Sequence, residues 1–284
     1  MKAELWQKVD QAIDLMRKGE RLALTLSPEE GYCLAFSGGK DSLAVYGLAK
    51  LAEVKFTPWY CVTGNDSPDT VYYIRRNFPD VKFYHPKKKF IQLVRQTGMP
   101  TMQRRFCCER LKERSFPGRA VLLGVRAEES RRRAKYTEVT IWSRRVEHKD
   151  KSPNRDAEWL GQVTHDCIKG QDQVKVNPIF YWSTAEVWTF IAESGLPVNP
   201  EYDRIGRVGC MFCPFASAAQ IEMYEMRYPR FAAAVKRAAA VELRRDSLNP
   251  FESIDEYWEW WKSKKSLQEF RRRKRQLELL LPSE

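Results

Sequence analysis

The chain has 284 residues, a formal net charge of +12 and 30% charged residues. That length suffices for one large domain or for a domain with an appendage. No apolar run approaches the roughly 18 residues of a membrane-spanning helix. Residues 1–20 mix charges with apolar positions, unlike a secretory leader, and seven cysteines are an odd number for a disulfide scaffold. We expect a cytoplasmic protein without membrane attachment, whose basic excess favours polyanionic ligands such as nucleic acids or nucleotides.

Short apolar runs alternate with helical patterns in the first half of the chain. Residues 1–20 have the periodicity of an amphipathic helix. Strand-like runs cover residues 32–36, 55–62, 81–84 and 120–124, and helical patterns cover 43–51, 70–77 and 90–97. This alternation predicts an α/β fold, with a Rossmann-like parallel sheet and helices on both faces. Ligands of such sheets bind beyond the carboxyl ends of the strands.

The second half of the chain contains a polar region and then mostly helical patterns. Residues 135–173 are polar and irregular, which predicts a long loop. A helix capped by Ser183 or Thr184 follows, and further helical patterns cover residues 218–226, 231–244 and 257–281. We therefore expect a nucleotide-binding domain over residues 1–220 and a basic helical C-terminal extension over residues 221–284.

A glycine-rich turn follows the first predicted strand. Its residues are Ser37, Gly38, Gly39, Lys40, Asp41 and Ser42. Two glycines allow backbone amides to face an anion, and the next helix adds its positive N-terminal end. A Walker A loop needs a glycine where this chain has Leu34, which excludes that motif. We predict that residues 37–42, with the Lys40 ammonium and two hydroxyls, hold the phosphates of a nucleotide.

This turn resembles the PP-loop of ATP pyrophosphatases. Four further segments resemble the phosphoadenosine phosphosulfate (PAPS) reductase group: Thr63-Gly64-Asn65, Gly124-Val125-Arg126 with Glu129-Ser130 and Arg133, Asn177-Pro178-Ile179, and Gly209-Cys210-Met211-Phe212-Cys213-Pro214. The resemblance implies an enzyme that binds ATP with Mg²⁺ and cleaves it between the α- and β-phosphates by adenylating a substrate. It also implies catalytic roles for Lys40 and Asp41, and places Thr63 and Gly64 in the nucleotide site.

An arginine-rich segment follows the fourth predicted strand. Guanidinium groups bind phosphate or sulfate oxygens through paired hydrogen bonds. An isolated run of charges is usually a solvated helix face, but this one lies at a strand end and matches the family motif. We interpret Arg126 and Arg133 as catalytic phosphate contacts, Ser130 as a further donor, and Glu129 as a residue that orients an arginine.

Four cysteines form two pairs, Cys107-Cys108 and Cys210-x-x-Cys213. Four thiolates suit Zn²⁺ or an iron–sulfur cluster. Adjacent cysteines fit a compact tetrahedral zinc site poorly, whereas each can bind a different iron of a cubane. The layout also resembles that of cluster-containing adenylylsulfate reductases, so we favour [4Fe–4S] over zinc or unrelated buried thiols. Cys167 is expected in a loop, either as a plain thiol or as a persulfide carrier.

Several functions remain open within this family. Sulfonucleotide reductases use a cysteine near the C-terminus in a Glu-Cys-Gly-x-His context, and here no cysteine follows Cys213. Relatives with a PP-loop, cluster cysteines and an Arg-x-x-Glu-Ser segment act in DNA phosphorothioation beside a cysteine desulfurase. We therefore predict a sulfurtransferase-type ATP pyrophosphatase that adenylates an acceptor oxygen in nucleic acid, with DNA favoured over tRNA. A cysteine desulfurase or another sulfur donor, and a multi-protein modification complex, are the implied partners. The alternatives are an APS or PAPS reductase, a tRNA thiolation enzyme and a nucleotide-sensing subunit.

Aromatic and basic residues alternate near the C-terminus. Trp258, Trp260 and Trp261 precede the basic run 271–275. Aromatics beside a basic helix suit the stacking of bases and contact with phosphates. The same pattern also suits a helix that buries its tryptophans and exposes its arginines. The sequence favours neither interpretation.

Overall fold

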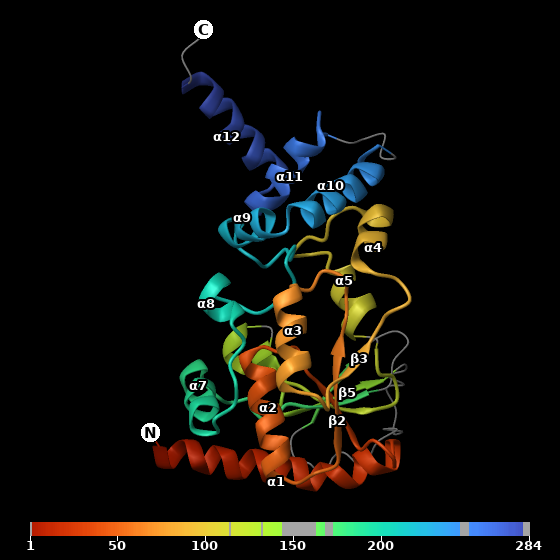
Figure 1. The fold of residues 1–284 in the computed structure, drawn as a ribbon, viewed down its shortest axis with the longest axis vertical. Coiled ribbons are helices and arrows are strands. Elements are labelled where there is room, and N and C mark those ends of the chain that lie inside the picture. The colour runs from red at the N-terminus through yellow and green to blue at the C-terminus, as the bar shows by residue number, and fades with distance from the viewer. Residues whose placement is uncertain are drawn as a thin grey trace. The chain divides into compact units, whose positions relative to one another are not determined.

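The structure is a computed structural model that describes residues 2–113, 115–131, 133–143, 163–167, 173–244 and 250–280 (Figure 1). The chain divides into two compact units, the first from residues 1–62, 68–85 and 113–208, the second from residues 63–67, 86–112 and 209–284. The second unit therefore contains more than the C-terminal extension expected from residue 221. None of the helices in the described ranges combines the length and the hydrophobicity needed to cross a membrane.

The first unit contains a sheet and helices that flank it. Its strands are β1 (Tyr32–Ala35), β2 (Phe56–Cys61), β3 (Lys82–Tyr84), β4 (Ala120–Leu122), β5 (Val139–Ser143), β6 (Val163–Cys167) and β7 (Gln173–Val176). Its α-helices are α1 (Lys2–Leu26), α2 (Lys40–Leu51), α3 (Pro68–Asn77), α7 (Thr184–Glu193) and α8 (Glu201–Ile205), and the short 3₁₀ helices η2 (Ala127–Glu129) and η3 (Arg133–Lys135) follow β4.

The strands form one sheet in the order β3-β2-β1-β4-β7-β5-β6. Every pairing is parallel except that between β5 and β7. The predicted α/β class with a mostly parallel sheet is therefore confirmed. Strand β1 lies between β2 and β4, so the sequence order of the strands reverses there. Such a switch point opens a crevice at the carboxyl ends of the two central strands, here β1 and β4.

The predicted loop over residues 135–173 is wrong in part. Strands β5 and β6 both lie inside it, and Cys167 ends β6 instead of lying in a loop. Val139 and Thr140 are buried where β5 pairs with β7. The sequence concealed these strands because polar residues surround them and because β7, which anchors them, has only four residues.

Local sequence explains why α2 follows β1. Strand β1 is an apolar run whose Tyr32, Cys33 and Leu34 are buried. In α2 every residue from Ser42 to Ala49 is buried, as expected for a helix that covers a central strand. Cys33 is a core residue, and burial raises the pKa of its thiol. The loop between β1 and α2 is thus held by two well-packed elements.

The second unit is helical where it is described. Its helices are α4 (Phe90–Thr97), α5 (Phe106–Cys108), the π-helical turn η1 (Glu109–Glu113), whose last residue belongs to the first unit, α9 (Ala218–Arg227), α10 (Pro229–Leu243), α11 (Ile254–Ser263) and α12 (Leu267–Leu280). One long helix was predicted over residues 257–281. Instead, α11 ends just before Lys264, which has φ +58°, and a separate helix α12 follows.

Two of the C-terminal tryptophans belong to the core of this unit. Trp258 is fully buried against Phe212, and its indole nitrogen donates to Glu225 at 2.7 Å. Trp261 is also buried and donates to the Pro100 carbonyl at 2.7 Å. These contacts support the interpretation in which the tryptophans dock the helix, and they leave neither indole available to stack on bases.

Candidate nucleotide-binding site

The loop of residues 37–42 joins β1 to α2 and is braced from within. Gly38 has φ +72°, a left-handed conformation that favours glycine. The Ser42 hydroxyl accepts from the Ser37 amide at 3.1 Å and donates to the Gly39 carbonyl at 2.9 Å. The Ser37 and Ser42 hydroxyls are 3.0 Å apart. The two serines predicted to donate to phosphates therefore contact each other, and they hold the loop in shape.

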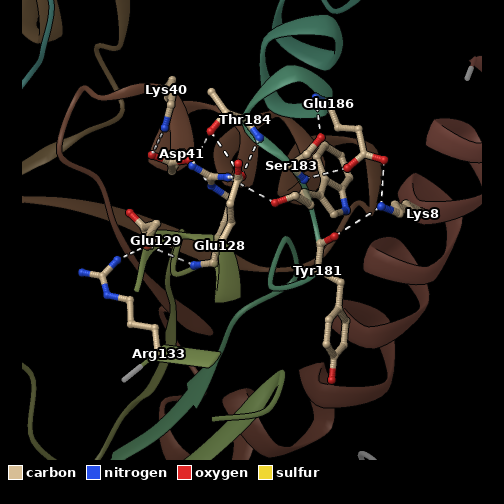
Figure 2. A network of polar contacts seen from close by, with 12 residues as sticks. Lys8, Lys40, Asp41, Glu128, Glu129, Arg133, Tyr181, Ser183, Thr184 and Glu186 are labelled. Atoms are coloured by element: carbon tan, nitrogen blue, oxygen red, sulfur yellow. Dashed lines mark hydrogen bonds and ion pairs between the residues drawn. The ribbon is translucent and has the colours of Figure 1, made fainter. Parts of the chain in front are cut away.

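Lys40, Asp41 and Arg126 meet where β1 and β4 end. The Lys40 ammonium bonds the Asp41 Oδ2 at 2.7 Å (Figure 2), and the Arg126 Nε bonds the Asp41 Oδ1 at 2.7 Å. Adjacent parallel strands bring these distant segments together. Gly124 permits the approach, because a Cβ there would lie 2.7 Å from the backbone carbonyl carbon of Asp41. The structure thus joins three of the four predicted catalytic residues.

The guanidinium of Arg126 is directed into the protein. Only 3% of the residue is exposed. Besides Asp41, it bonds the Glu128 carboxylate at 2.5 Å, the Trp182 carbonyl at 3.2 Å and the Thr184 hydroxyl at 3.1 Å. Figure 2 shows Glu128 reaching Thr184, whose amide donates to Glu128 at 2.8 Å. The Arg126 hydrogen bond lowers the pKa of Glu128. This geometry suits a residue that positions Asp41 better than the phosphate contact we expected.

The second predicted arginine has a different environment. The Arg133 guanidinium bonds the Glu129 carboxylate (Figure 2), and 40% of the Arg133 side chain is exposed. Glu129 also accepts from the Arg126 amide at 3.1 Å, and the Ser130 hydroxyl accepts from the Arg133 amide at 3.2 Å. Arg133 is therefore partly exposed, and its guanidinium is bonded to Glu129. Arg132 lies outside the described residues.

Two residues that the sequence analysis missed contact the loop. The Tyr202 hydroxyl accepts from the Lys40 amide at 2.7 Å, and the buried Asn199 amide donates to the Gly38 carbonyl at 3.2 Å. The Tyr202 ring packs edge-on against Trp188, with ring centroids 4.9 Å apart. Burial raises the pKa of Tyr202 to about 12, so it remains a neutral phenol. The Asn-Pro turn at residue 199 was the available signal.

Thr63 and Gly64 belong to the second unit, whereas the loop belongs to the first. The Asp66 carboxylate accepts from the Thr63 amide at 2.6 Å, the Thr63 hydroxyl at 3.0 Å and the Gly64 amide at 3.1 Å. Asn65 bonds both the amide and the carbonyl of Phe212. This turn is therefore tied to the segment that carries Cys210 and Cys213.

All four predicted metal-binding cysteines also lie in the second unit and are partly exposed. The Lys112 ammonium is 3.4 Å from the Cys210 sulfur, and the charge of Cys210 raises the pKa of this lysine. A hydrogen bond with Cys108 raises the pKa of Cys107, and burial raises that of Cys210. Across the described ranges, no three His, Cys, Asp or Glu side chains are close enough to hold a metal ion.

A second cation lies near this group of thiols. The Lys264 ammonium is buried and has no hydrogen-bond partner among the described residues. It lies 4.1 Å from the centroid of the Trp261 ring, and it interacts electrostatically with Cys213. Burial lowers the pKa of Lys264 to about 8. An unpartnered buried ammonium beside thiols is expected where those thiols carry negative charge.

Comparisons with known proteins place the chain in a family. Residues 31–216 match the phosphoadenosine phosphosulfate reductase domain. The chain is 24% identical to an uncharacterized protein of Methanocaldococcus jannaschii over 69% of this chain, and spans only 39% of that protein. It is 26% identical to an uncharacterized protein of Escherichia phage 186, covering 71% of this chain and 72% of that protein.

Among solved structures, PAPS reductase from Candida auris in a phosphate complex aligns with a TM-score of 0.43 and 15% identity, over 74% of this chain and 95% of that one. Because both values are low, the assignment rests on the domain match, which covers most of the chain. The chain belongs to the phosphoadenosine phosphosulfate reductase domain family.

Proposed function

We propose that the chain is an ATP pyrophosphatase that adenylates an acceptor oxygen in nucleic acid in preparation for sulfur transfer. The observation that carries this proposal is the Lys40–Asp41–Arg126 constellation at the switch point of the sheet, behind a glycine loop. A helix N-terminus, loop amides and an ammonium at one place suit a polyphosphate. Because the chain belongs to this family, we infer that the polyphosphate is that of an adenine nucleotide.

In this scheme the residues of the loop act in sequence. The Lys40 ammonium turns from Asp41 to the β- and γ-phosphates, where it stabilises the negative charge of the departing pyrophosphate. Arg126 keeps Asp41 in place through this change, because its own position is fixed by Glu128, Thr184 and the Trp182 carbonyl. The acceptor oxygen attacks the α-phosphorus, the bond to the β-phosphate breaks, and pyrophosphate leaves with its electron pair.

Asp41 fits a Mg²⁺ site in this proposal. Magnesium at nucleotide sites is usually held by one or two carboxylates together with phosphates and waters. Once Lys40 turns to the phosphates, the Asp41 Oδ2 loses its ion-pair partner. Magnesium supplies charge neutralisation for the leaving group when it is bound. The loop contains no other carboxylate.

We favour an iron–sulfur cluster over a single metal ion at the four cysteines, because adjacent cysteines can each bind a different iron of a cubane. Besides the hydrogen bond with Cys108 and burial, the charges of neighbouring thiols contribute to raising the pKa values of Cys107 and Cys210. Lys112 and the orphaned Lys264 ammonium supply positive charge that would offset four thiolates. When bound, a cluster at these positions supplies redox chemistry, a sulfur-binding iron or structural support.

The net charge of the chain and its family support a proposal for the acceptor and the partners. A net charge of +12 suits a nucleic-acid acceptor, and we favour a DNA phosphate oxygen over a tRNA base. The persulfide of a cysteine desulfurase or of another donor attacks the activated phosphorus, and AMP leaves with the activated oxygen. A second thiol then attacks the resulting P–S–S–R linkage, which releases the phosphorothioate and leaves a disulfide. The family match also supports one alternative function, which is the reduction of a small sulfonucleotide. In that case Arg133 would contact the sulfonucleotide and the products would include sulfite.

The products of ATP turnover test the proposal. Purified protein is incubated with ATP labelled at the α-phosphate, Mg²⁺, a persulfide donor and either DNA or tRNA, and the labelled nucleotides and the released pyrophosphate are measured. We expect AMP and pyrophosphate, formed by the native protein and lost in Lys40→Ala. Formation of ADP and phosphate contradicts adenylation. Release of sulfite from a sulfonucleotide with thioredoxin identifies the alternative, and mass spectrometry of nucleosides and dinucleotides distinguishes DNA from tRNA products.

A further inference from the structure

Helix α4 of the second unit has one buried side and one exposed side. Phe90, Leu93 and Val94 are buried, and the helix packs along α10. Its exposed side, together with the turn before it, lines an open depression of about 590 Å³, formed by Lys87, Lys88, Gln92, Arg95 and Gln96. We call these five residues the α4 surface. The packed side fixes their backbone, so the α4 surface is a defined site and not a mobile basic tail.

The polar groups of the α4 surface are arranged as donors. The Gln92 side-chain carbonyl accepts from the Lys89 amide at 2.9 Å, and the Gln96 side-chain carbonyl accepts from the Lys88 ammonium at 3.2 Å. Both glutamine carbonyls thus accept hydrogen bonds within the protein, and the exposed side chains offer their NH₂ groups as donors. Within the described ranges, no carboxylate pairs with the three basic residues of this surface.

The sequence around the α4 surface is also rich in basic residues and poor in acidic ones. Residues 86–112 contain eight Lys and Arg but a single acidic residue, Glu109. A site that offers ammonium, guanidinium and amide donors, and no acceptor, is suited to an anion. Because the depression is open and its donors extend along a helix, the ligand is an extended anion and not a small enclosed one. A nucleic-acid backbone provides such phosphates at regular spacing.

We propose that the α4 surface binds the phosphodiester backbone of the nucleic acid on which the enzyme acts. Lys, Arg and Gln side chains are common phosphate contacts, and such contacts set the position of a protein on nucleic acid without reading its sequence. This inference rests on the proposed function, since it assumes a nucleic-acid acceptor. It adds where that acceptor is held and predicts binding without sequence preference at this surface.

Salt dependence gives the expected magnitude. Each phosphate neutralised on duplex DNA contributes about 0.9 to the slope of log K against log salt, which is about an eightfold gain in affinity near 0.1 M salt. Three contacts, from Lys87, Lys88 and Arg95, therefore contribute about 2.7 to the slope and more than two orders of magnitude in affinity. RNA and single strands follow the same rule with a shallower slope of about 0.7 per contact.

The test compares two triple variants with the same change in net charge. The first is Lys87→Gln, Lys88→Gln, Arg95→Gln. The control is Lys18→Gln, Lys50→Gln, Lys82→Gln, whose lysines are exposed and already paired with carboxylates in the first unit. Fluorescence anisotropy with labelled DNA and RNA duplexes is measured over a range of salt concentrations. A conservative variant, Lys87→Arg, Lys88→Arg, Arg95→Lys, and the melting temperatures show whether charge or folding is responsible.

We expect the first variant to lose about a hundredfold or more in affinity and most of the predicted slope, while the control and the conservative variant stay near the native protein. If the first variant and the control bind nucleic acid with equal affinity, the proposal that the α4 surface binds nucleic acid is wrong, but the proposed function is unaffected. A native protein that binds neither DNA nor RNA overturns both. Loss of binding to the sulfur donor, with nucleic-acid binding unchanged, assigns the surface to an acidic protein and also overturns it.

Discussion

Replacing Arg126 tests whether this residue positions Asp41 or contacts substrate. The guanidinium makes four hydrogen bonds, two of them to carboxylates, and is 3% exposed. Its carboxylate partners Asp41 and Glu128 are 22% and 53% exposed, so removing Arg126 leaves no fully buried charge. The lost hydrogen bonds, discounted for this exposure, cost about 2–3 kcal/mol. Because a folded protein is stabilised by roughly 5–15 kcal/mol, Arg126→Met is expected to lower the melting temperature by about 4–12 °C.

Arg133→Met provides the matched comparison. Its guanidinium pairs with Glu129 at the surface, and such pairs contribute about 0–1 kcal/mol. We expect Arg133→Met to melt within a few degrees of the native protein but to lose turnover, because we propose that the Arg133 guanidinium contacts the anionic substrate. The melting temperature of Arg126→Lys is expected to lie between those of the native protein and Arg126→Met, since an ammonium cannot make the paired hydrogen bonds of the planar guanidinium.

Thermal unfolding followed by circular dichroism, together with titration of a non-hydrolysable ATP analogue, measures both effects. The analogue should bind more weakly to Arg126→Met, even at temperatures where that variant is fully folded, because Asp41 is no longer held. A melting temperature of Arg126→Met within about 2 °C of the native value would show that the inward contacts contribute little, since that corresponds to less than about 1 kcal/mol.

Three further changes test other parts of the structure. Tyr202→Phe removes the hydroxyl that occupies a loop amide, and calorimetric titration should show the ATP analogue binding about 2- to 12-fold more tightly; weaker binding would mean that the hydroxyl contacts the nucleotide. Gly124→Ala places a Cβ against the first turn of α2 and should cost about 1–3 kcal/mol in denaturant unfolding, with reduced nucleotide affinity; an unchanged midpoint refutes the close approach. Iron and sulfide counts after anaerobic purification should fall in Cys210→Ala but not in Cys61→Ala, and a native protein without iron contradicts the cluster.

The parts of the site that are local in sequence were predictable. A strand, a glycine turn and a helix in succession located the loop, because each depends on residues within a few positions of one another. Strand alternation likewise predicted the sheet. The apolar runs of β1 and β4 also placed the loop and the arginine segment at strand ends, although no sequence signal specified that Asp41 and Arg126 form an ion pair.

The parts that depend on distant packing were not predictable. Tyr202 accepts from the Lys40 amide, 162 positions away, and the nearby Asn-Pro sequence indicates a turn but not this contact. The inward orientation of Arg126 depends on Glu128 and on Thr184, the first residue of α7. Short strands also escaped detection, because β5 depends on pairing with β7, and β6 on pairing with β5, and not on an apolar run of their own.

The second unit is assembled from three separated stretches, so the chain passes between the units five times. During synthesis the ribosome exposes residues 63–67 and 86–112 long before their partners after residue 209 emerge. Those early stretches, with Cys107 and Cys108, must wait for nearly the whole chain to be made. Neither unit can then be obtained as a contiguous fragment, and a deletion from residue 221 onward would remove the packing partners of α4 and of the Cys210 segment together.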